Sequence, residues 1–177
     1  MRPTRTARPT ASSRVTETAR RIHVPIHLRW GDLDALNHVN NTSMLKLLEE
    51  ARLRAFWQPD AGLDGPPTAV LDAGLSAHGE TMTLIARQEI EYLAPVPYQQ
   101  RPLDVQLWIG RLGGSSIDVC YDVYSPAGAA PQTLYARSTA VVVMVDAATG
   151  RPTRLTPHMR EAWEPYVSAP ISYAHRR

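Results

Sequence analysis

Polar side chains that could carry acid–base chemistry gather between residues 32 and 41 of the 177-residue chain. The stretch reads DLDALNHVNN and contains Asp32, Asp34, His38 and three asparagines. A carboxylate or imidazole in such a loop can take a proton from water, and a carboxylate can also attack an electrophilic carbon itself. The same residue types cap helices and close turns through side-chain hydrogen bonds. Residue types alone leave a catalytic and a structural interpretation open.

A helix is predicted directly after this loop, over about residues 43–57. Its apolar residues recur at helical spacing, and Glu50 precedes Arg54 by four residues, the favourable order for an ion pair. The first turn of a helix exposes N–H groups that no intrahelical carbonyl accepts, and its dipole places about half a positive charge there. A backbone N–H near Asn41 could therefore stabilise an oxygen that develops negative charge, as an oxyanion hole does.

Strands are predicted on both sides of this loop and helix. Residues 23–30, HVPIHLRW, alternate and place Val24, Ile26, Leu28 and Trp30 on one face. Four longer β-rich runs follow at about residues 81–93, 102–112, 115–125 and 133–147, separated by segments such as GG and PAGAAP. These runs predict an antiparallel meander. A short final helix is expected to begin at Pro157, with Thr156 as its N-cap.

The fold class that follows is α+β. One apolar helix and an antiparallel sheet of about five strands must bury each other's apolar faces, so the sheet is expected to wrap around the helix. That arrangement is the hot-dog fold. We expect one such domain over residues 22–168, preceded by a disordered basic tail at residues 1–21 and followed by a flexible tail at residues 169–177.

The motif DLDALNHVNN, followed by LLEEAR, resembles the hot-dog acyl-CoA thioesterases of the 4-hydroxybenzoyl-CoA thioesterase-like family. The resemblance runs from about residue 22 to residue 163 and includes EIEYLAPVPY and the turn GRLGGSS. The D-x-x-x-H-V-N-N core is also similar to plant acyl-ACP thioesterases. The resemblance implies an enzyme that hydrolyses an acyl-CoA thioester to a free acid and CoA.

The resemblance also assigns roles to single residues of the loop. It places the catalytic carboxylate at Asp34 rather than Asp32, either as a nucleophile or as the base that activates a water molecule. His38 and Asn37 would orient the water or the carboxylate, and Asn41 would carry the oxyanion-binding N–H. In the plant enzymes the asparagine that corresponds to Asn37 lies one residue earlier relative to the aspartate.

The CoA moiety is expected on the surface, with its phosphates at the turn GRLGGSS, as the resemblance implies. Arg111 offers a planar guanidinium group that suits phosphate, and Ser115 and Ser116 offer hydroxyl donors. Arg87, on an outer strand face, is a further candidate. A hairpin turn with a flanking charge is also an ordinary structural feature, so both interpretations stay open.

Composition argues against several other classes of partner. Residues 1–21 carry six arginines against Glu17 alone, which fits a solvated tail better than a nucleic-acid site. No apolar run approaches the roughly eighteen residues of a membrane span. No histidines and cysteines stand at metal-ligand spacing, so neither a metal nor another cofactor is expected. The single Cys120 on a predicted strand favours a reducing compartment, the cytoplasm.

Assembly is expected at the edge of the sheet. The resemblance implies that two chains join their sheets as a homodimer, or as a dimer of dimers, and build each active site from both subunits. Two other functions stay open at this point. One is a non-catalytic acyl-CoA-binding hot-dog protein, and the other is a hot-dog enoyl-CoA hydratase or dehydratase.

Overall fold

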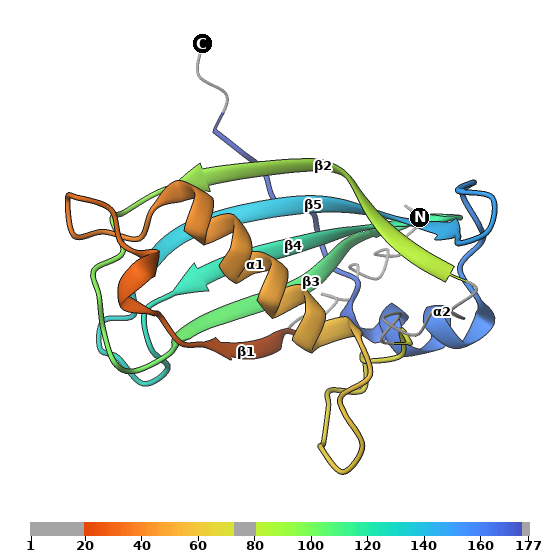
Figure 1. Ribbon diagram of the computed structural model, residues 1–177, viewed down its shortest axis with the longest axis horizontal. Helices are drawn as coiled ribbons and strands as arrows, with labels where there is room; N and C mark the ends of the chain where they lie inside the picture. Colours follow the sequence, from red (N-terminus) through yellow and green to blue (C-terminus); the bar gives the residue numbers. More distant parts are fainter. Residues whose placement is uncertain (1–19, 73–80, 175–177) are drawn as a thin grey trace, which may run out of the picture.

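The computed structural model describes residues 20–72 and 81–174, and the predicted basic tail lies outside this part of the chain up to residue 19. A curved antiparallel sheet wraps around one long helix, α1 (Figure 1). The sheet consists of β1 (Ile22–Ile26), β2 (Thr81–Tyr92), β3 (Leu103–Leu112), β4 (Ser116–Tyr124) and β5 (Leu134–Asp146). The helices are α1 (Asn41–Phe56) and α2 (Pro157–Trp163), with short 3-10 helices at Trp30–Asp32 and Glu164–Tyr166. The predicted α+β hot-dog architecture is confirmed.

The strand order of the five-stranded sheet is β1-β3-β4-β5-β2. Strands β3, β4 and β5 form a meander as predicted, but the prediction that the meander also includes β2 is wrong. Strand β2 pairs with β5 at one edge, and β3 pairs with β1 at the other. The reason is the helix: α1 crosses the face of the sheet between β1 and β2, so the chain leaves one edge and returns at the opposite one (Figure 1).

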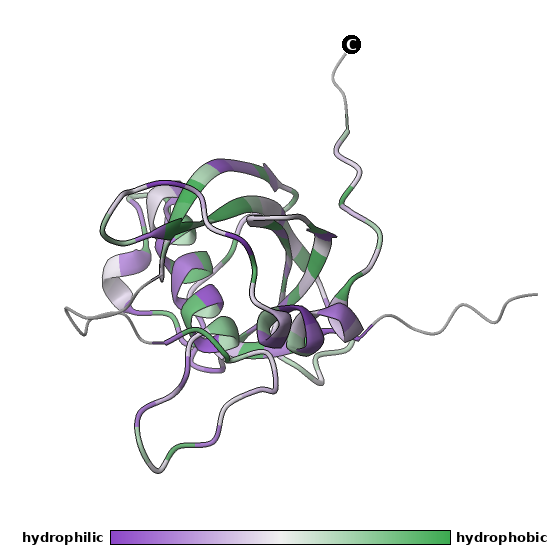
Figure 2. Ribbon diagram, turned by 90° about the vertical axis from the view of Figure 1, so that its right-hand side faces the viewer, coloured by the Kyte–Doolittle hydropathy of each residue, from purple (hydrophilic) through white to green (hydrophobic). Residues whose placement is uncertain are grey.

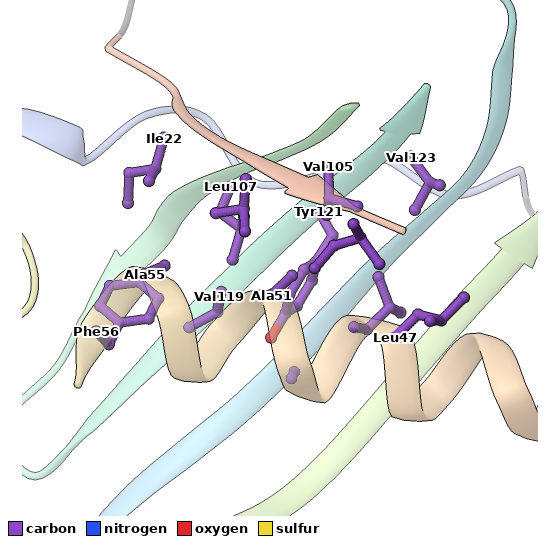
Figure 3. Close-up of a cluster of buried hydrophobic side chains, with 14 of the residues drawn as sticks. Ile22, Leu47, Ala51, Ala55, Phe56, Val105, Leu107, Val119, Tyr121 and Val123 are labelled. Carbon is purple, nitrogen blue, oxygen red and sulfur yellow. The ribbon is translucent and has the colours of Figure 1, made fainter. Parts of the chain in front are cut away.

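Helix α1 holds the core together. Its buried face, which includes Leu47, Ala51 and Phe56, packs on inward-facing residues of the sheet such as Leu107 and Tyr121 (Figure 3). Each large apolar side chain buried in this way contributes roughly 1.5–3 kcal/mol. The exposed face carries the predicted pair of Glu50 and Arg54, whose carboxylate oxygen and Nε lie 2.7 Å apart.

Local signals at the helix ends are confirmed, whereas one strand prediction is not. The hydroxyl of Thr156 accepts a hydrogen bond from the N–H of Met159 at 3.2 Å, and Pro157 opens α2. Trp30 was expected on the buried face of the first strand but is 72% exposed. Strand β1 ends at Ile26, and a 3-10 helix then carries Trp30, so the two-residue alternation no longer fixes the direction of its side chain.

Residues 169–174, for which the sequence predicts a flexible tail, lie along the sheet face that points away from α1. The indole N–H of Trp108 donates to the carbonyl of Ala169 at 2.9 Å, and the hydroxyl of Tyr173 donates to the Thr139 hydroxyl at 2.8 Å. Burial raises the pKa of Tyr173 to about 12, so its hydroxyl keeps the proton that it donates. Contacts with side chains far away in the sequence thus hold this segment.

Candidate active site

The polar loop before α1 folds back on itself as a narrow hairpin. Backbone hydrogen bonds of 2.8 and 2.9 Å and one β-bridge pair its two arms: Asp32 with Asn40, Asp34 with His38, and Leu33 with Val39. Asn37 closes the turn with a φ of 58°, in the left-handed region that asparagine tolerates better than most residues. The loop is therefore an ordered element with a fixed geometry. The pair of Asp32 and Asn40 sets its position next to α1, because Asn40 is the N-cap of that helix.

Asp34 is the residue that this hairpin fixes most directly. One carboxylate oxygen, Oδ1, accepts hydrogen bonds from the N–H of Leu36 at 2.8 Å and of His38 at 3.3 Å. Its second oxygen, Oδ2, has no hydrogen-bond partner in the described part of the chain. By contrast, Asp32 accepts from the N–H of Arg29 at 2.7 Å and caps the 3-10 helix. Each aspartate thus has one oxygen bound to backbone N–H groups and one without a hydrogen-bond partner among the described residues, and only the contact of Asp32 is a helix cap.

The start of α1 offers a free donor next to this hairpin. The N–H of Thr42 is held by the side-chain oxygens of Asn40 and Asn41, each at 2.8 Å, whereas the N–H of Asn41 meets no acceptor among the described residues. Asp34 stands two residues along the hairpin from Asp32, which pairs with Asn40. Strand geometry therefore puts Asp34 and the helix start about 7 Å apart along the hairpin. The predicted residues Asp34, Asn37, His38 and Asn41 all lie within this one compact unit.

A second segment, residues 92–97, completes this end of the molecule. Val39 donates its N–H to the carbonyl of Val96 at 2.9 Å, which holds the segment against the hairpin. A hollow of about 260 Å³ lies between them, lined by Val39, Met44 and residues 92–96. This hollow adjoins the first turn of α1, because Val39 and Met44 stand on either side of the helix start.

Tyr92 is the residue of this segment that the sequence did not single out. Its hydroxyl donates to the carbonyl of Asn41 at 3.3 Å, so it supports the residue whose N–H is free. Burial raises the pKa of Tyr92, which favours the protonated, donating form of the phenol. The stretch EIEYLAP pointed to this region, but the contact joins residues 51 positions apart, which no local pattern predicts.

The turn expected to bind CoA lies at the opposite end of the sheet, whereas Arg87 lies near the middle of β2. Ile26, which precedes the hairpin with Asp34, pairs with Leu103 at the start of β3. The turn with Ser115 and Ser116 follows the far end of β3, about 30 Å away by strand rise. One copy of the chain does not bring this turn and Asp34 together.

The arginines proposed for CoA already have carboxylate partners. The guanidinium of Arg111 donates to both oxygens of Asp118 at 3.2 and 3.3 Å, and Arg87 donates to Glu89 at 2.7 Å. Both guanidinium groups are exposed, so these are surface ion pairs that a phosphate could displace at little cost. Gly113 allows the tight turn beside Arg111, because a Cβ there would lie 2.8 Å from the carbonyl oxygen of Ser116.

Other chemistry finds less support in the described residues. They contain no group of three or more His, Cys, Asp or Glu side chains that could hold a metal ion. Over the same residues, no helix combines the length and the apolar character needed to cross a membrane.

Comparison with known families shows the superfamily to which the chain belongs. The model of the thioesterase-like superfamily matches residues 28–163, from just before the hairpin to the end of α2. The chain belongs to the thioesterase-like superfamily. The motif around Asp34 and the helix that follows thus lie inside the matched region, and the resemblance seen in the sequence is confirmed. No curated protein matches the chain.

Solved structures agree with this membership. A thioesterase from Thermus thermophilus, complexed with coenzyme A and zinc, is 27% identical, with 80% of this chain and 94% of that chain covered and a TM-score of 0.58. A protein from Pseudomonas aeruginosa is 26% identical, with 83% and 92% covered and a TM-score of 0.64. A predicted thioesterase from Bacillus stearothermophilus, at 21% identity, shares the fold, with 86% and 100% covered and a TM-score of 0.64.

Proposed function

We propose that this thioesterase-like protein hydrolyses acyl-CoA thioesters to a free acid and CoA. The observation that carries the proposal is the hairpin, which holds the half-free carboxylate of Asp34 beside the free N–H of Asn41. Coenzyme A in the similar Thermus thermophilus thioesterase supports CoA as the carrier.

The start of α1 serves as the oxyanion hole. The thioester carbonyl oxygen accepts a hydrogen bond from the N–H of Asn41, and the positive end of the helix dipole adds to its stabilisation. This oxygen gains negative charge as the tetrahedral intermediate forms. Removing one such donor typically costs roughly 3–4 kcal/mol of transition-state stabilisation. Tyr92 supports the same residue through its carbonyl, which belongs to the following peptide unit.

Asp34 acts on the carbonyl carbon through one of two routes. As a general base, it takes a proton from water, whose oxygen attacks the carbon and expels the CoA thiolate. As a nucleophile, it attacks the carbon itself, the C–S bond breaks and the CoA thiolate leaves, and water then hydrolyses the resulting mixed anhydride to the free acid and the Asp34 carboxylate. In both routes Oδ1 keeps its hydrogen bonds from backbone N–H groups, while Oδ2 takes the proton from water or attacks the carbonyl carbon. His38, and Asn37 at the turn, orient the attacking water.

In a homodimer, or a dimer of dimers, the CoA-binding turn of one subunit can lie close to Asp34 of the other. Strand β2 is a long edge strand with a neighbour on one side only, and it carries the exposed apolar residues Met82, Leu84, Ile85 and Tyr92. Such an edge recruits another strand. Two copies of β2 can pair antiparallel about a two-fold axis. The first residues of one β2 then lie beside the last residues of the other. The partner's CoA-binding turn then approaches the hairpin with Asp34.

Leu84→Lys is expected to convert the dimer to a monomer. Leu84 is 53% exposed on β2, and a charge on an edge strand opposes strand pairing. Size-exclusion chromatography with light scattering measures the mass, and thiol release should fall with it. Val167→Lys, at a 41% exposed residue outside the sheet edge, is the matched control and should stay dimeric. A dimeric Leu84→Lys protein would contradict this interface.

Arg111→Ala is expected to raise KM for acyl-CoA several-fold and to change kcat little. A phosphate contact remote from the carbonyl binds substrate and transition state equally, so its loss appears in KM. Steady-state kinetics of Arg111→Ala and Arg87→Ala would show which of the two arginines contacts the phosphates. A fall in kcat without a change in KM would instead place Arg111 beside the reacting atoms.

A panel of acyl-CoA esters assayed for release of free thiol tests the proposed activity directly. A hydrolase releases thiol in proportion to added protein, whereas a non-catalytic binding protein releases none and a hydratase adds water to an enoyl chain instead.

The buried free thiol of Cys120 suits a reducing compartment, and we place the activity in the cytoplasm.

A further inference from the structure

The CoA-binding turn, residues 113–116, is held by the chain that follows β5. Figure 2 views the molecule from the end where α2 lies. The guanidinium of Arg160 in α2 donates a hydrogen bond to the carbonyl of Gly113. The N–H of Leu155, just before α2, donates to the carbonyl of Gly114 at 2.9 Å. Two successive carbonyl groups of the turn are therefore already bound.

These two contacts decide where the neighbouring N–H groups point. A trans peptide unit is planar, so its C=O and N–H groups point in opposite directions. The unit with the carbonyl of Gly113 also carries the N–H of Gly114, and the next unit carries the N–H of Ser115. Neither N–H meets an acceptor in the described part of the chain. A Cβ built on Gly114 would meet no atom within 4 Å beyond its chain neighbours, so the space around it is open.

Helix α2, which supplies Arg160, is itself fixed to the core. Trp163 is fully buried, and its indole N–H donates to the carbonyl of Thr68 at 2.9 Å. Met159 is buried as well. Arg160 lies between these two anchors in the sequence, and within residues 20–72 and 81–174 no carboxylate forms an ion pair with it. Its contact with the turn thus links the turn to the core.

We propose that Arg160 positions the CoA-binding turn, so that the N–H groups of Gly114 and Ser115 bind a phosphate group of CoA. The inference rests on the proposed function. Successive N–H groups of this kind form a concave site for an anion. Without Arg160, the carbonyl of Gly113 is free to rotate towards the phosphate, which it would repel. Arg160 is therefore a positioning residue that acts through the backbone of the turn, while Arg111 offers its guanidinium to the phosphate directly.

Amide proton signals of the wild-type protein test the two donors. We titrate the protein with free CoA and follow proton–nitrogen correlation spectra. The signals of Gly114 and Ser115 should move downfield, because a hydrogen bond to a phosphate oxygen deshields the amide proton. Pantetheine, which lacks the phosphates, should leave both signals in place. Signals that do not respond to CoA would overturn the inference.

Arg160→Met separates this role from a general effect on stability. Methionine keeps an unbranched side chain that suits a helix, but it has no donor for the carbonyl of Gly113. We expect KM for an acyl-CoA to rise by about tenfold, the scale of one hydrogen bond to a charged group, with little change in kcat. The pantetheine thioester of the same acyl group should be hydrolysed as by the wild type. Arg160→Ala serves where the methionine variant does not fold.

Arg154→Ala is the matched control for loss of a positive charge near the turn. Arg154 is exposed and directly precedes Leu155, but its side chain makes no hydrogen bond to the residues that the structure describes. We expect KM for acyl-CoA to change far less than in Arg160→Met. An equal rise in both variants would mean that charge alone matters, and would overturn the positioning role.

The outcomes separate failure of this inference from failure of the proposed function. If Arg160→Met weakens CoA binding but the signals of Gly114 and Ser115 still move as in the wild type, Arg160 attracts the phosphate itself. If the variant loses as much activity on the pantetheine thioester, its role is structural. Either result overturns the inference and leaves hydrolysis intact. Absence of thiol release from both thioesters by the wild-type protein would instead overturn the proposed function.

Discussion

Asp34→Asn is expected to lower kcat on a good acyl-CoA substrate by a factor of roughly 10² to 10⁴, the scale of a positioned acid–base group or nucleophile. The amide keeps one oxygen that can accept from the N–H groups of Leu36 and His38, so the hairpin should persist. What disappears is the negative charge and the capacity to take a proton or attack carbon. Steady-state thiol release measures the loss, and a thermal melt should show little change in Tm.

Asp32→Asn is the matched control for this prediction. Asp32 lies in the same hairpin, but its carboxylate caps the 3-10 helix through the N–H of Arg29, a contact that an amide oxygen can also make. We expect far less loss of activity from this change. Equal losses from both variants, or a Tm that falls together with activity, would mean that the two aspartates only hold the hairpin in shape. Near-normal kcat in a folded Asp34→Asn dimer would refute the mechanism.

Asn41→Pro is expected to lower kcat by a factor of roughly 10² to 10³, because it deletes the single N–H proposed as the oxyanion donor. Proline is well tolerated at the first position of a helix, where its fixed φ suits the helix and its missing N–H breaks no helical bond. The preceding residue, Asn40, has φ −61° and ψ 143°, a conformation that proline permits in its neighbour. The helix should therefore form as before, with its catalytic donor removed.

Asn41→Ala separates the backbone donor from the side chain. Alanine keeps the N–H, and the N–H of Thr42 keeps its bond to the side chain of Asn40. We expect activity close to that of the wild type, with KM unchanged, while Asn41→Pro loses kcat. If Asn41→Ala lost as much activity as Asn41→Pro at the same Tm, the asparagine side chain and not the backbone N–H would carry the function.

Much of the local structure was predictable because its causes lie within a few residues. The recurrence of apolar residues at intervals of three and four positions predicted α1, and Thr156 with Pro157 predicted the start of α2. The sequence predicted only a polar loop at residues 32–40, but the hairpin found there rests on the same kind of contact, because its hydrogen bonds join residues at most eight positions apart. A sequence carries such short-range preferences directly, in residue types and their spacing.

The position of β2 could not be predicted in this way. All four later strands have similar alternation, and nothing in their sequences says which one lies at the edge. The strand order depends on α1, which crosses the sheet and buries its apolar face against it. Only the folded arrangement removes that face from water. This strand order leaves β2 as one of the two edge strands, and Arg111 lies at the end of β3 that is remote from the hairpin with Asp34.

The sequence by itself determined that this chain has a polar loop with a carboxylate, a helix with exposed N–H groups in its first turn, and a sheet to bury that helix. These depend on local hydrogen bonds and on the periodicity of apolar residues. Only the tertiary structure decided that Tyr92 supports Asn41, that Trp30 is exposed, and that a hollow of about 1600 Å³ lies at the far end from the hairpin. Those features depend on contacts between segments remote in sequence. Such contacts are set by packing and by which strands are neighbours in the sheet.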